Sequence, residues 1–224
     1  MPLTNDDVNS QSESTEMYLI TVYRLTRQAP AASTKDIADM LNVSPPSVSE
    51  RIKRLTEQGY LNHAWREGTT LTEAGERIAV NVLRKHRLVE TFLVEMAGYN
   101  LDEIHDEACH IEHAISDRLA DRLEVILKHP TVDPHGHPIP TKNGEVAVVT
   151  YHPLAEVEPG ERVVIRQVSD WDNAQLNYLQ SLGLVPGVEI EILDRAPFDG
   201  PLTVKLGSKV FALAQDIAQT VGVQ

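Results

Sequence analysis

Two imidazoles, a thiol and a carboxylate recur along one short stretch of the sequence, HDEACHIEH, which holds the only cysteine of the chain. At about 3.6 residues per turn, positions separated by four, seven and eight residues fall on one face of a helix. A globular protein normally fills such a face with apolar side chains. Nitrogen, sulfur and carboxylate ligands together indicate a first-row transition metal rather than Ca²⁺ or Mg²⁺. The residues at these positions are His105, Cys109, Glu112 and His113.

A second pair of the same kind lies upstream, where His86 and Glu90 are four residues apart in a predicted long helix. Buried imidazoles and carboxylates are costly unless they are paired or bind a metal, so the two helices together favour a metal site. Each residue also has an ordinary alternative. A single histidine is often hydrogen-bonded or exposed, and a single cysteine is often a small core residue.

Three further histidines stand in the segment HPTVDPHGHPIPTKNGE, whose four prolines prevent a continuing helix. We interpret this segment as a linker. We expect its histidines, His129, His135 and His137, to be solvated rather than to bind a metal.

The pattern of elements predicts a chain that is mainly α with a small C-terminal β-barrel or sandwich. Residues up to about 75 alternate short helices with a hairpin, and the next region is almost free of Gly and Pro and is predicted to form long helices. After the linker come short β-rich runs such as RVVIRQV and VEIEILD. The polar start, MPLTNDDVNSQSESTE, is expected to be a disordered lead-in to a first helix over 16–28.

The spacing of apolar residues in the segment STKDIADMLNVSPPSVSERIKRLTEQGYL predicts two short helices joined by a tight turn. Ser33 with Asp36 fits a capping box for the first helix. Ser44 fits the N-cap of the second helix, with Pro45 at its first position. The apolar positions that anchor this second helix are Val48, Ile52 and Leu55.

Two helices in this arrangement form a DNA-reading unit, in which the N-terminal half of the second helix enters the major groove. The next stretch, YLNHAWREGTTLT, reads as two strands that turn at Glu67–Gly68, so the unit is predicted to be a winged helix. Such helix pairs can be purely structural, but the wing and the clustered basic residues favour DNA binding. The residues expected to meet DNA are Ser44, Pro46, Ser47, Ser49, Glu50, Arg51, Lys53, Arg54 and Arg66.

Composition sets limits on the function. The formal net charge of −13 argues against nucleic-acid binding unless basic groups cluster locally, as they do in the second helix. No apolar run approaches the roughly 18 residues that a membrane span needs. The start of the chain does not resemble a signal peptide, and one cysteine forms no internal disulfide. We therefore expect a cytoplasmic protein without a membrane partner.

The runs STEMYL, RKHRLVE and, above all, IHDEACHIEHAISD resemble the diphtheria toxin repressor (iron-dependent regulator) family, as do GHPIP and the β-rich C-terminal region. The resemblance covers the chain from about Ser14 on. It implies a dimeric, metal-activated transcription factor that binds double-stranded DNA. The implied domains are a winged helix-turn-helix over 1–75, a helical metal-binding and dimerisation domain over 76–141, and a linker with a Src-homology-3-like (FeoA-like) domain over 142–224.

By matching position, the resemblance implies two metal sites per subunit. The ligands of the first would be Met17, Cys109, Glu112 and His113. The ligands of the second would be His86, Glu90, His105, Asp172 and Gln175, where Asp172 is shorter than the Glu common in the family. Thioether and thiolate ligands favour Fe²⁺, with Mn²⁺ a close second, although ligation by the carbonyl of Cys109 would remove that distinction.

One residue of the second helix departs from the iron-responsive members, which usually carry Gln where this sequence has Glu50. A carboxylate accepts from the amino group of cytosine and repels phosphate, so a different operator is expected.

The resulting hypothesis is a switch, in which a metal joins Met17 to the ligands of the helical domain and selects the arrangement of a dimer that reads a palindromic operator. The main alternative is a zinc hydrolase that uses the same cluster, but the sequence has no HExxH, nucleophile elbow or phosphate loop. A third alternative is a protein-interaction module on a scaffold without a metal. We expect no enzyme and no small-molecule substrate.

Overall fold

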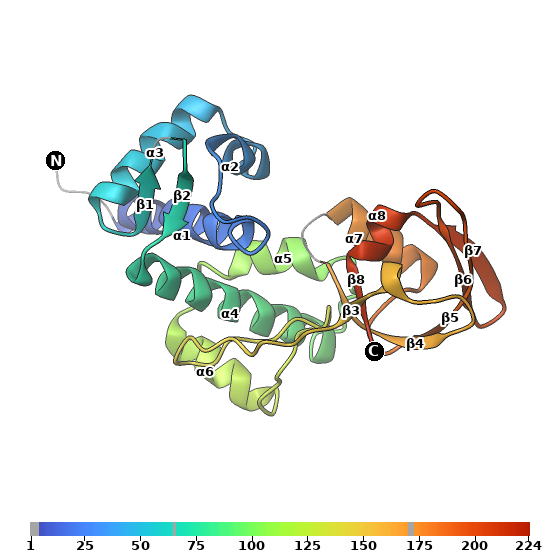
Figure 1. Ribbon diagram of the computed structural model, residues 1–224. Helices are drawn as coiled ribbons and strands as arrows, with labels where there is room; N and C mark the ends of the chain where they lie inside the picture. The colour runs from blue at the N-terminus through green and yellow to red at the C-terminus, as the bar shows by residue number, and fades with distance from the viewer. Residues whose placement is uncertain (1–4, 65, 170–172) are drawn as a thin grey trace. The chain divides into compact units, whose positions relative to one another are not determined.

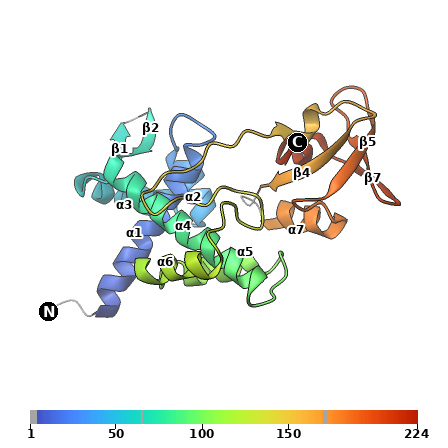
Figure 2. The same cartoon turned by 90° about the horizontal axis from the view of Figure 1, so that it is seen from below.

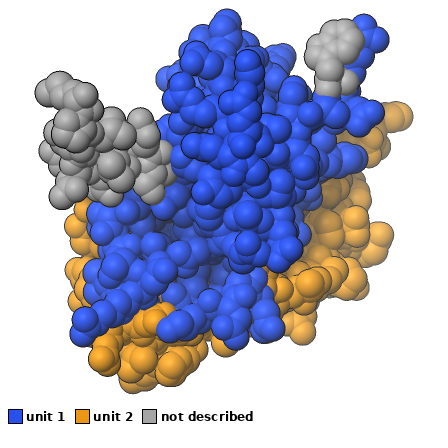
Figure 3. Space-filling model, turned by 90° about the vertical axis from the view of Figure 1, so that its left-hand side faces the viewer, with its two compact units in different colours: residues 1–86, 111–120, 140–145 blue, residues 87–110, 121–139, 146–224 orange. Residues whose placement is uncertain are grey.

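The computed structural model describes residues 5–64, 66–169 and 173–224 (Figure 1). The chain forms two compact units, which Figure 3 distinguishes by colour. The first unit consists of residues 1–86, 111–120 and 140–145, and the second of residues 87–110, 121–139 and 146–224. Among the described residues, no helix has the length and apolar character that crossing a membrane requires.

A winged helix occupies the N-terminal part of the first unit (Figures 1 and 2). Its two strands pair antiparallel, with Leu61 opposite Leu71. A bridge between Ala32 and Thr69 ties the second strand to the segment that precedes the second helix. The elements in chain order are α1 (Asn5–Leu25), α2 (Thr34–Leu41), α3 (Pro45–Glu57), β1 (Leu61–Ala64) and β2 (Gly68–Leu71).

The expected helix caps are confirmed. Ser33 precedes α2, and its hydroxyl accepts the main-chain N–H of Asp36 at 3.0 Å. Ser44 precedes α3 and accepts the N–H of Ser47 at 3.4 Å. The apolar positions of α3 are buried, as the sequence predicts, so the opposite face of the helix is left for solvent or a ligand. These buried residues are Val48, Ile52 and Leu55.

The start of the chain differs from the expectation. Helix α1 begins at Asn5, so the expected disordered lead-in is wrong from that residue on. The segment from Asn5 to Leu25 contains neither glycine nor proline, and nothing in its backbone interrupts a helix that continues from the apolar part around Leu19.

Three helices follow, α4 (Glu73–Glu95), α5 (Ile104–Ile111) and α6 (Asp117–Ile126). The expected single helical face from His105 to His113 is interrupted, because α5 ends at Ile111. The N–H of Ala114 donates to the carbonyl of Ile111 at 2.9 Å, which tightens the chain into a turn. Glu112 and His113 therefore lie in this turn rather than on the helix.

The C-terminal part of the second unit is a six-stranded antiparallel sheet in the order β3-β8-β4-β5-β6-β7. The runs RVVIRQV and VEIEILD are confirmed as two strands, β4 and β5, which pair with each other. Its core contains the fully buried Leu154, Ile165 and Leu179. The elements are β3 (His152–Pro153), β4 (Arg162–Val168), α7 (Asn173–Leu182), β5 (Glu189–Arg195), β6 (Leu202–Leu206), β7 (Lys209–Leu213), α8 (Gln215–Gln219) and β8 (Val221–Val223).

Candidate metal centre and DNA-reading surface

Helix α3 presents a row of small and charged side chains to solvent. The ion pair between Glu50 and Arg54 spans 3.6 Å, and both side chains remain more than half exposed. Small hydroxyl and proline side chains at the start of such a helix allow close approach to base edges. The exposed residues from the predicted DNA-reading set are Ser44, Pro46, Ser47, Ser49, Glu50, Lys53, Arg54 and, at the hairpin turn, Arg66.

Arg51 differs from the other predicted DNA contacts. Its guanidinium donates to the hydroxyl of Thr15 at 2.9 Å and lies over the ring of Tyr18, 6.0 Å from the centroid. Burial, and then the neighbouring charge of Arg54, lower the pKa of Arg51. Arg51 thus links α3 to the part of α1 that directly precedes Met17.

A cluster of ligand-type side chains forms in the first unit where α1 meets the turn after α5. The Nε2 atom of His113 lies 3.1 Å from the Met17 sulfur and 3.1 Å from a carboxylate oxygen of Glu112. Its Nδ1 atom lies 2.6 Å from Glu16, and the second oxygen of Glu112 lies 2.6 Å from Nδ1 of His86. We call these five residues the first cluster.

The charges of the first cluster stabilise one another. Burial alone would raise the pKa of Glu112, but hydrogen bonds from His113 and His86 lower it to about 2. Burial alone would lower the pKa of His113, but its hydrogen bonds to Glu112 and Glu16 raise it to about 9. At neutral pH the turn therefore holds a carboxylate against an imidazolium.

The first cluster fits a transition-metal ion by its donor set. The Met17 thioether and one carboxylate oxygen of Glu112 lie against Nε2 of His113, and the other oxygen of Glu112 lies against Nδ1 of His86. Nitrogen, sulfur and carboxylate donors of this kind suit a first-row transition metal. Ca²⁺ and Mg²⁺ are bound almost entirely by oxygen, so the sulfur of Met17 and the two imidazoles do not suit them.

These pKa values predict how pH affects the unfolding of the metal-free protein. The contribution of His113 to the free energy of unfolding is complete below its usual pKa of 6.5 and is lost as pH rises through its folded-state pKa of about 9. The contribution of Glu112 to the free energy of unfolding is complete above its usual pKa of 4.5 and is lost as pH falls towards its folded-state pKa of about 2. In excess chelator, we expect the free energy of unfolding to fall by on the order of 2 kcal/mol between pH 6 and pH 9.

Urea denaturation at a series of pH values measures this dependence. The His113→Gln variant is the matched comparison, since it keeps a polar side chain but cannot titrate. In this variant the free energy of unfolding should not decrease above pH 6.5. The same decrease in both proteins would assign the effect to other groups.

A second cluster lies in the second unit, and it includes a histidine that the sequence did not assign. Glu90 on α4 is fully buried, with Oε1 3.5 Å from Nδ1 of His105 and 3.6 Å from Nδ1 of His135. His135 is fully buried too, and among the described residues neither of its ring nitrogens has a hydrogen-bond partner. A buried imidazole with available nitrogens beside a buried carboxylate also fits a metal ion. Glu90, His105 and His135 are called the second cluster below.

The linker histidines therefore do not behave alike. The expectation that all three are solvated is wrong for His135 and His137, which are 0% and 6% exposed, and holds for His129, whose side chain is 68% exposed. Proline and glycine in the segment indicated a loop correctly, but composition cannot show that the loop packs against a strand.

The structure brings together some of the predicted ligands. Met17, Glu112 and His113 meet in the first unit, and Glu90 meets His105 in the second. The half-buried Cys109 lies in the second unit, with its sulfur 3.7 Å from Nε2 of His105.

Three ligands of the second site stay predictions. His86 stands one helical turn before Glu90 but contacts Glu112. Gln175 lies on α7, and Asp172 lies outside the described residues.

Sequence reasoning missed two members of these clusters. Glu16 precedes Met17 directly, so its proximity to a predicted ligand was a usable signal. His135 had no such signal, because it approaches Glu90 only through the path of the linker.

Comparison with known families gives three matches in chain order. The N-terminal DNA-binding domain of the iron-dependent repressors matches residues 11–69, and their metal-binding and dimerisation domain matches residues 72–141. The FeoA domain matches residues 152–224. These matches agree with a winged helix, a helical domain and a Src-homology-3-like sheet.

Whole-chain relatives extend this likeness. The chain is 31% identical to the diphtheria toxin repressor of Corynebacterium diphtheriae, over 95% of this chain and 97% of that one. It is 33% identical to the iron-dependent repressor IdeR of Mycobacterium tuberculosis, over 97% and 99% of the two chains. A solved manganese-dependent transcriptional repressor in complex with manganese is 36% identical, with a TM-score of 0.81 over 93% of this chain and 98% of that chain.

None of these relatives supports the hydrolase alternative, since all are named as repressors. The three matched domains and the likeness over the full length give a single assignment: this chain belongs to the iron-dependent repressor family of metal-dependent, DNA-binding transcriptional regulators, which are not enzymes.

Proposed function

We propose that this protein is a cytoplasmic repressor of metal homeostasis genes, which takes up Fe²⁺ or Mn²⁺ and then binds a palindromic DNA operator as a homodimer. The observation that carries the proposal is the meeting of Met17 with Glu112 and His113. Met17 belongs to α1 of the winged helix, whereas Glu112 and His113 follow α5. A cation shared by these side chains would connect the DNA-reading part of the chain to its helical part.

The contacts of α1 suggest how this connection reaches DNA. Arg51 on α3 donates to Thr15, two residues before Met17, so a displacement of α1 changes the support of α3. When bound, a divalent cation supplies positive charge to a site that otherwise needs a proton on His113. The resident side chains then hold α1 in one position, which favours one arrangement of the two reading helices. We propose Met17, Glu112 and His113 as ligands here, together with Cys109 as the sequence predicts.

A gel shift titrated with Fe²⁺, Mn²⁺ and Zn²⁺, each compared with excess chelator, tests the function. We expect at least about tenfold tighter operator binding with Fe²⁺ or Mn²⁺, since allosteric coupling of about 1–3 kcal/mol corresponds to 5–150-fold. Fe²⁺ requires anaerobic conditions. Equal DNA affinity with metal and with chelator would refute the proposal.

A second cation per subunit is proposed at Glu90, His105 and His135. Burial of a carboxylate among imidazoles that accept a metal supports this assignment. His86, Asp172 and Gln175 stay as the further ligands that the sequence predicts. The softness of the donors differs between the sites, because the second cluster lacks a thioether.

The homodimer is proposed to form through the region that matches the dimerisation domain, which includes α6. Three large apolar side chains of this helix are about half exposed, and Leu119 and Ile126 are seven residues apart and so share a face. Exposed apolar faces of this kind mark interaction surfaces. The third side chain is Val125.

An Ile126→Asp variant tests this face, because a charge buried in an apolar interface is costly. Sedimentation velocity should show a shift towards the monomer, with weaker binding to the full palindrome than to a single half-site. Glu124→Gln, a change at a neighbouring charged position of α6, should sediment as the unaltered chain does. A dimer that withstands Ile126→Asp would place the interface elsewhere.

A further inference from the structure

We propose that a pocket of the second unit, lined by the loop after α4 and by helix α7, binds a neutral nucleobase that carries an amino group, such as the adenine of adenosine. The base is bound as a ligand rather than as a substrate, and Gln180 is its main polar contact. We call this site the Gln180 pocket. The inference goes beyond the proposed function, because it involves neither the two metal clusters nor the DNA-reading surface.

The polar face of α7 forms one wall of the Gln180 pocket. Asn177, Gln180 and Ser181 are three and four residues apart, so they share a face of the helix, while Leu176 and Leu179 are buried in the core. The pocket has a volume of about 570 Å³. Sites for small molecules usually have roughly 300–1,000 Å³, so a nucleoside fits the available space.

The side-chain amide of Gln180 has an unused donor and an unused acceptor. Its Nε2 and Oε1 atoms are both buried, and within the described part of the chain neither has a hydrogen-bond partner. Buried amides are nearly always paired, because a buried polar group without a partner is destabilising. Rotation of this amide into the pocket breaks no hydrogen bond to a described residue. A ligand therefore gains both of its hydrogen bonds without replacing existing ones.

The groups around Gln180 mainly accept hydrogen bonds. Nδ2 of Asn100 donates to Glu103 at 3.0 Å, which orients the amide and leaves its oxygen as an acceptor. The hydroxyl of Ser181 donates to the carbonyl of Tyr178 at 2.7 Å, so towards a ligand it can only accept. Asp102 adds a carboxylate, which is an acceptor as well. Such a wall suits a ligand with an amino group.

The charge and the apolar surface of the pocket narrow the class of ligand. None of the described residues that line it is positively charged, and Asp102 is negative, so a phosphate or a free carboxylate is repelled. Tyr99, which is 39% exposed, offers an aromatic ring on which a flat base can stack. Adenine carries an amino group beside a ring nitrogen, and a glutamine amide matches this pair with two hydrogen bonds.

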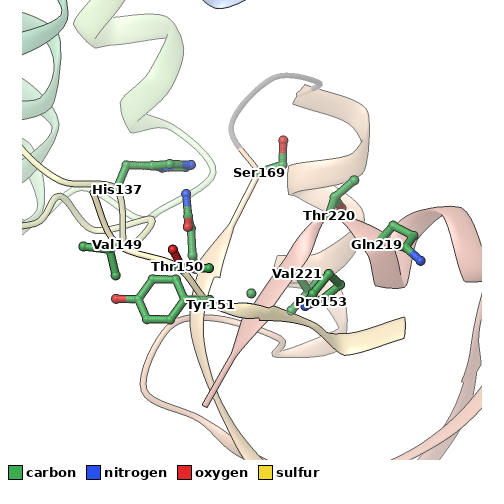
Figure 4. Close-up of a pocket in the computed structure, with 11 residues that line it drawn as sticks. His137, Val149, Thr150, Tyr151, Pro153, Ser169, Gln219, Thr220 and Val221 are labelled. Atoms are coloured by element: carbon green, nitrogen blue, oxygen red, sulfur yellow. The ribbon is translucent and has the colours of Figure 1, made fainter. Parts of the chain in front are cut away.

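A different cavity of the second unit, of about 340 Å³, lies beside the C-terminal sheet and has no comparable amide. At its wall the hydroxyl of Thr220 donates to the carbonyl of Ile217 at 2.8 Å. Figure 4 shows the side chain of Gln219, another lining residue, extending away from His137. Gln219 is exposed, so water meets its amide. It therefore provides a control residue of the same type as Gln180.

Calorimetric titration of the full chain with adenosine, purine riboside and adenosine monophosphate tests the proposal. Adenosine should bind, and purine riboside, which lacks the amino group, should bind at least about tenfold more weakly. In Gln180→Leu, adenosine should bind about 10–100-fold more weakly, since two neutral hydrogen bonds are lost. The monophosphate should bind more weakly than adenosine at low ionic strength, and Asp102→Asn should reduce that difference.

Gln219→Leu is the matched control, because it makes the same chemical change outside the Gln180 pocket. It should bind adenosine within about twofold of the unaltered chain. Without nucleoside, the melting temperature of Gln180→Leu should be equal to or above that of the unaltered chain, because the amide has no described partner to lose. The side-chain amide resonance of Gln180 should shift when adenosine is added.

Three results would overturn the inference. They are a dissociation constant for adenosine weaker than about 1 mM, equal affinity for adenosine and purine riboside, and equal affinity of Gln180→Leu and the unaltered chain. None of these results bears on the proposed function, since metal-dependent operator binding is measured without nucleoside. Conversely, loss of the metal response in the gel shift would leave adenosine binding intact.

Discussion

Glu112→Gln is expected to remove most of the metal-dependent gain in operator binding, about tenfold or more, because a metal raises DNA affinity only through the coupling between its site and the DNA-reading surface. Both carboxylate oxygens of Glu112 are engaged, one with His113 and one with His86. The amide is nearly the same size but carries no charge, and its nitrogen would face an imidazole. Fluorescence anisotropy of a labelled operator, titrated with protein in Mn²⁺ and in chelator, measures the effect.

The control for this experiment is Glu107→Gln on the adjacent helix α5, which removes the same charge outside both clusters. Its DNA affinity should stay within about twofold in either condition. The melting curve of metal-free Glu112→Gln should still show cooperative unfolding, because the apolar core of the winged helix is untouched. Unchanged metal dependence in Glu112→Gln would show that the cation binds elsewhere.

Glu50→Gln is expected to change which operator the protein prefers. The Glu50 side chain is 77% exposed on α3, and its pair with Arg54 at 3.6 Å is too exposed to restrain it. A carboxylate accepts a hydrogen bond from the amino group of cytosine, whereas a glutamine amide forms two hydrogen bonds with adenine. One good pairing is worth about 1–3 kcal/mol, so preference at one position of each half-site should shift about 5–150-fold towards adenine.

Selection from an operator library randomised at each position, in the presence of metal, reads this change directly. Glu57→Gln at the last residue of the same helix is the control, since it removes an exposed charge far from the first helical turns. It should leave the preferred sequence unaltered and raise affinity for all DNA slightly. An identical preference for the unaltered protein and Glu50→Gln would exclude Glu50 from base reading.

Local chemistry made much of the fold predictable from the sequence. The caps at Ser33 and Ser44 depend on a hydroxyl within reach of the next free N–H groups, and such short-range geometry is encoded by neighbouring residues. The alternation of apolar residues in RVVIRQV predicted strand β4 for the same reason. The residue types in HDEACHIEH indicated a metal, since few other functions explain such groups on a helix that must be packed.

The expected helical face from His105 to His113 was wrong because contacts between distant segments decide this part of the chain. No glycine or proline ends α5 at Ile111; beyond it, Glu112 and His113 contact His86, Glu16 and Met17. These partners are up to 97 residues away in the chain, so no periodic pattern could reveal them. The helical start of α1 at Asn5 was missed because polar composition alone suggested disorder.

By itself, the sequence determined the kinds of ligand, the winged helix and the β-rich end of the chain, because these follow from residue type and short-range spacing. Only the tertiary structure decided which ligands meet. It placed His135 in a buried cluster, since Gly136 lets a proline-rich loop lie on β4 and bring that ring to Glu90. Packing of this kind depends on how well the side chains of segments far apart in the sequence fit together, and neither composition nor periodicity indicates that fit.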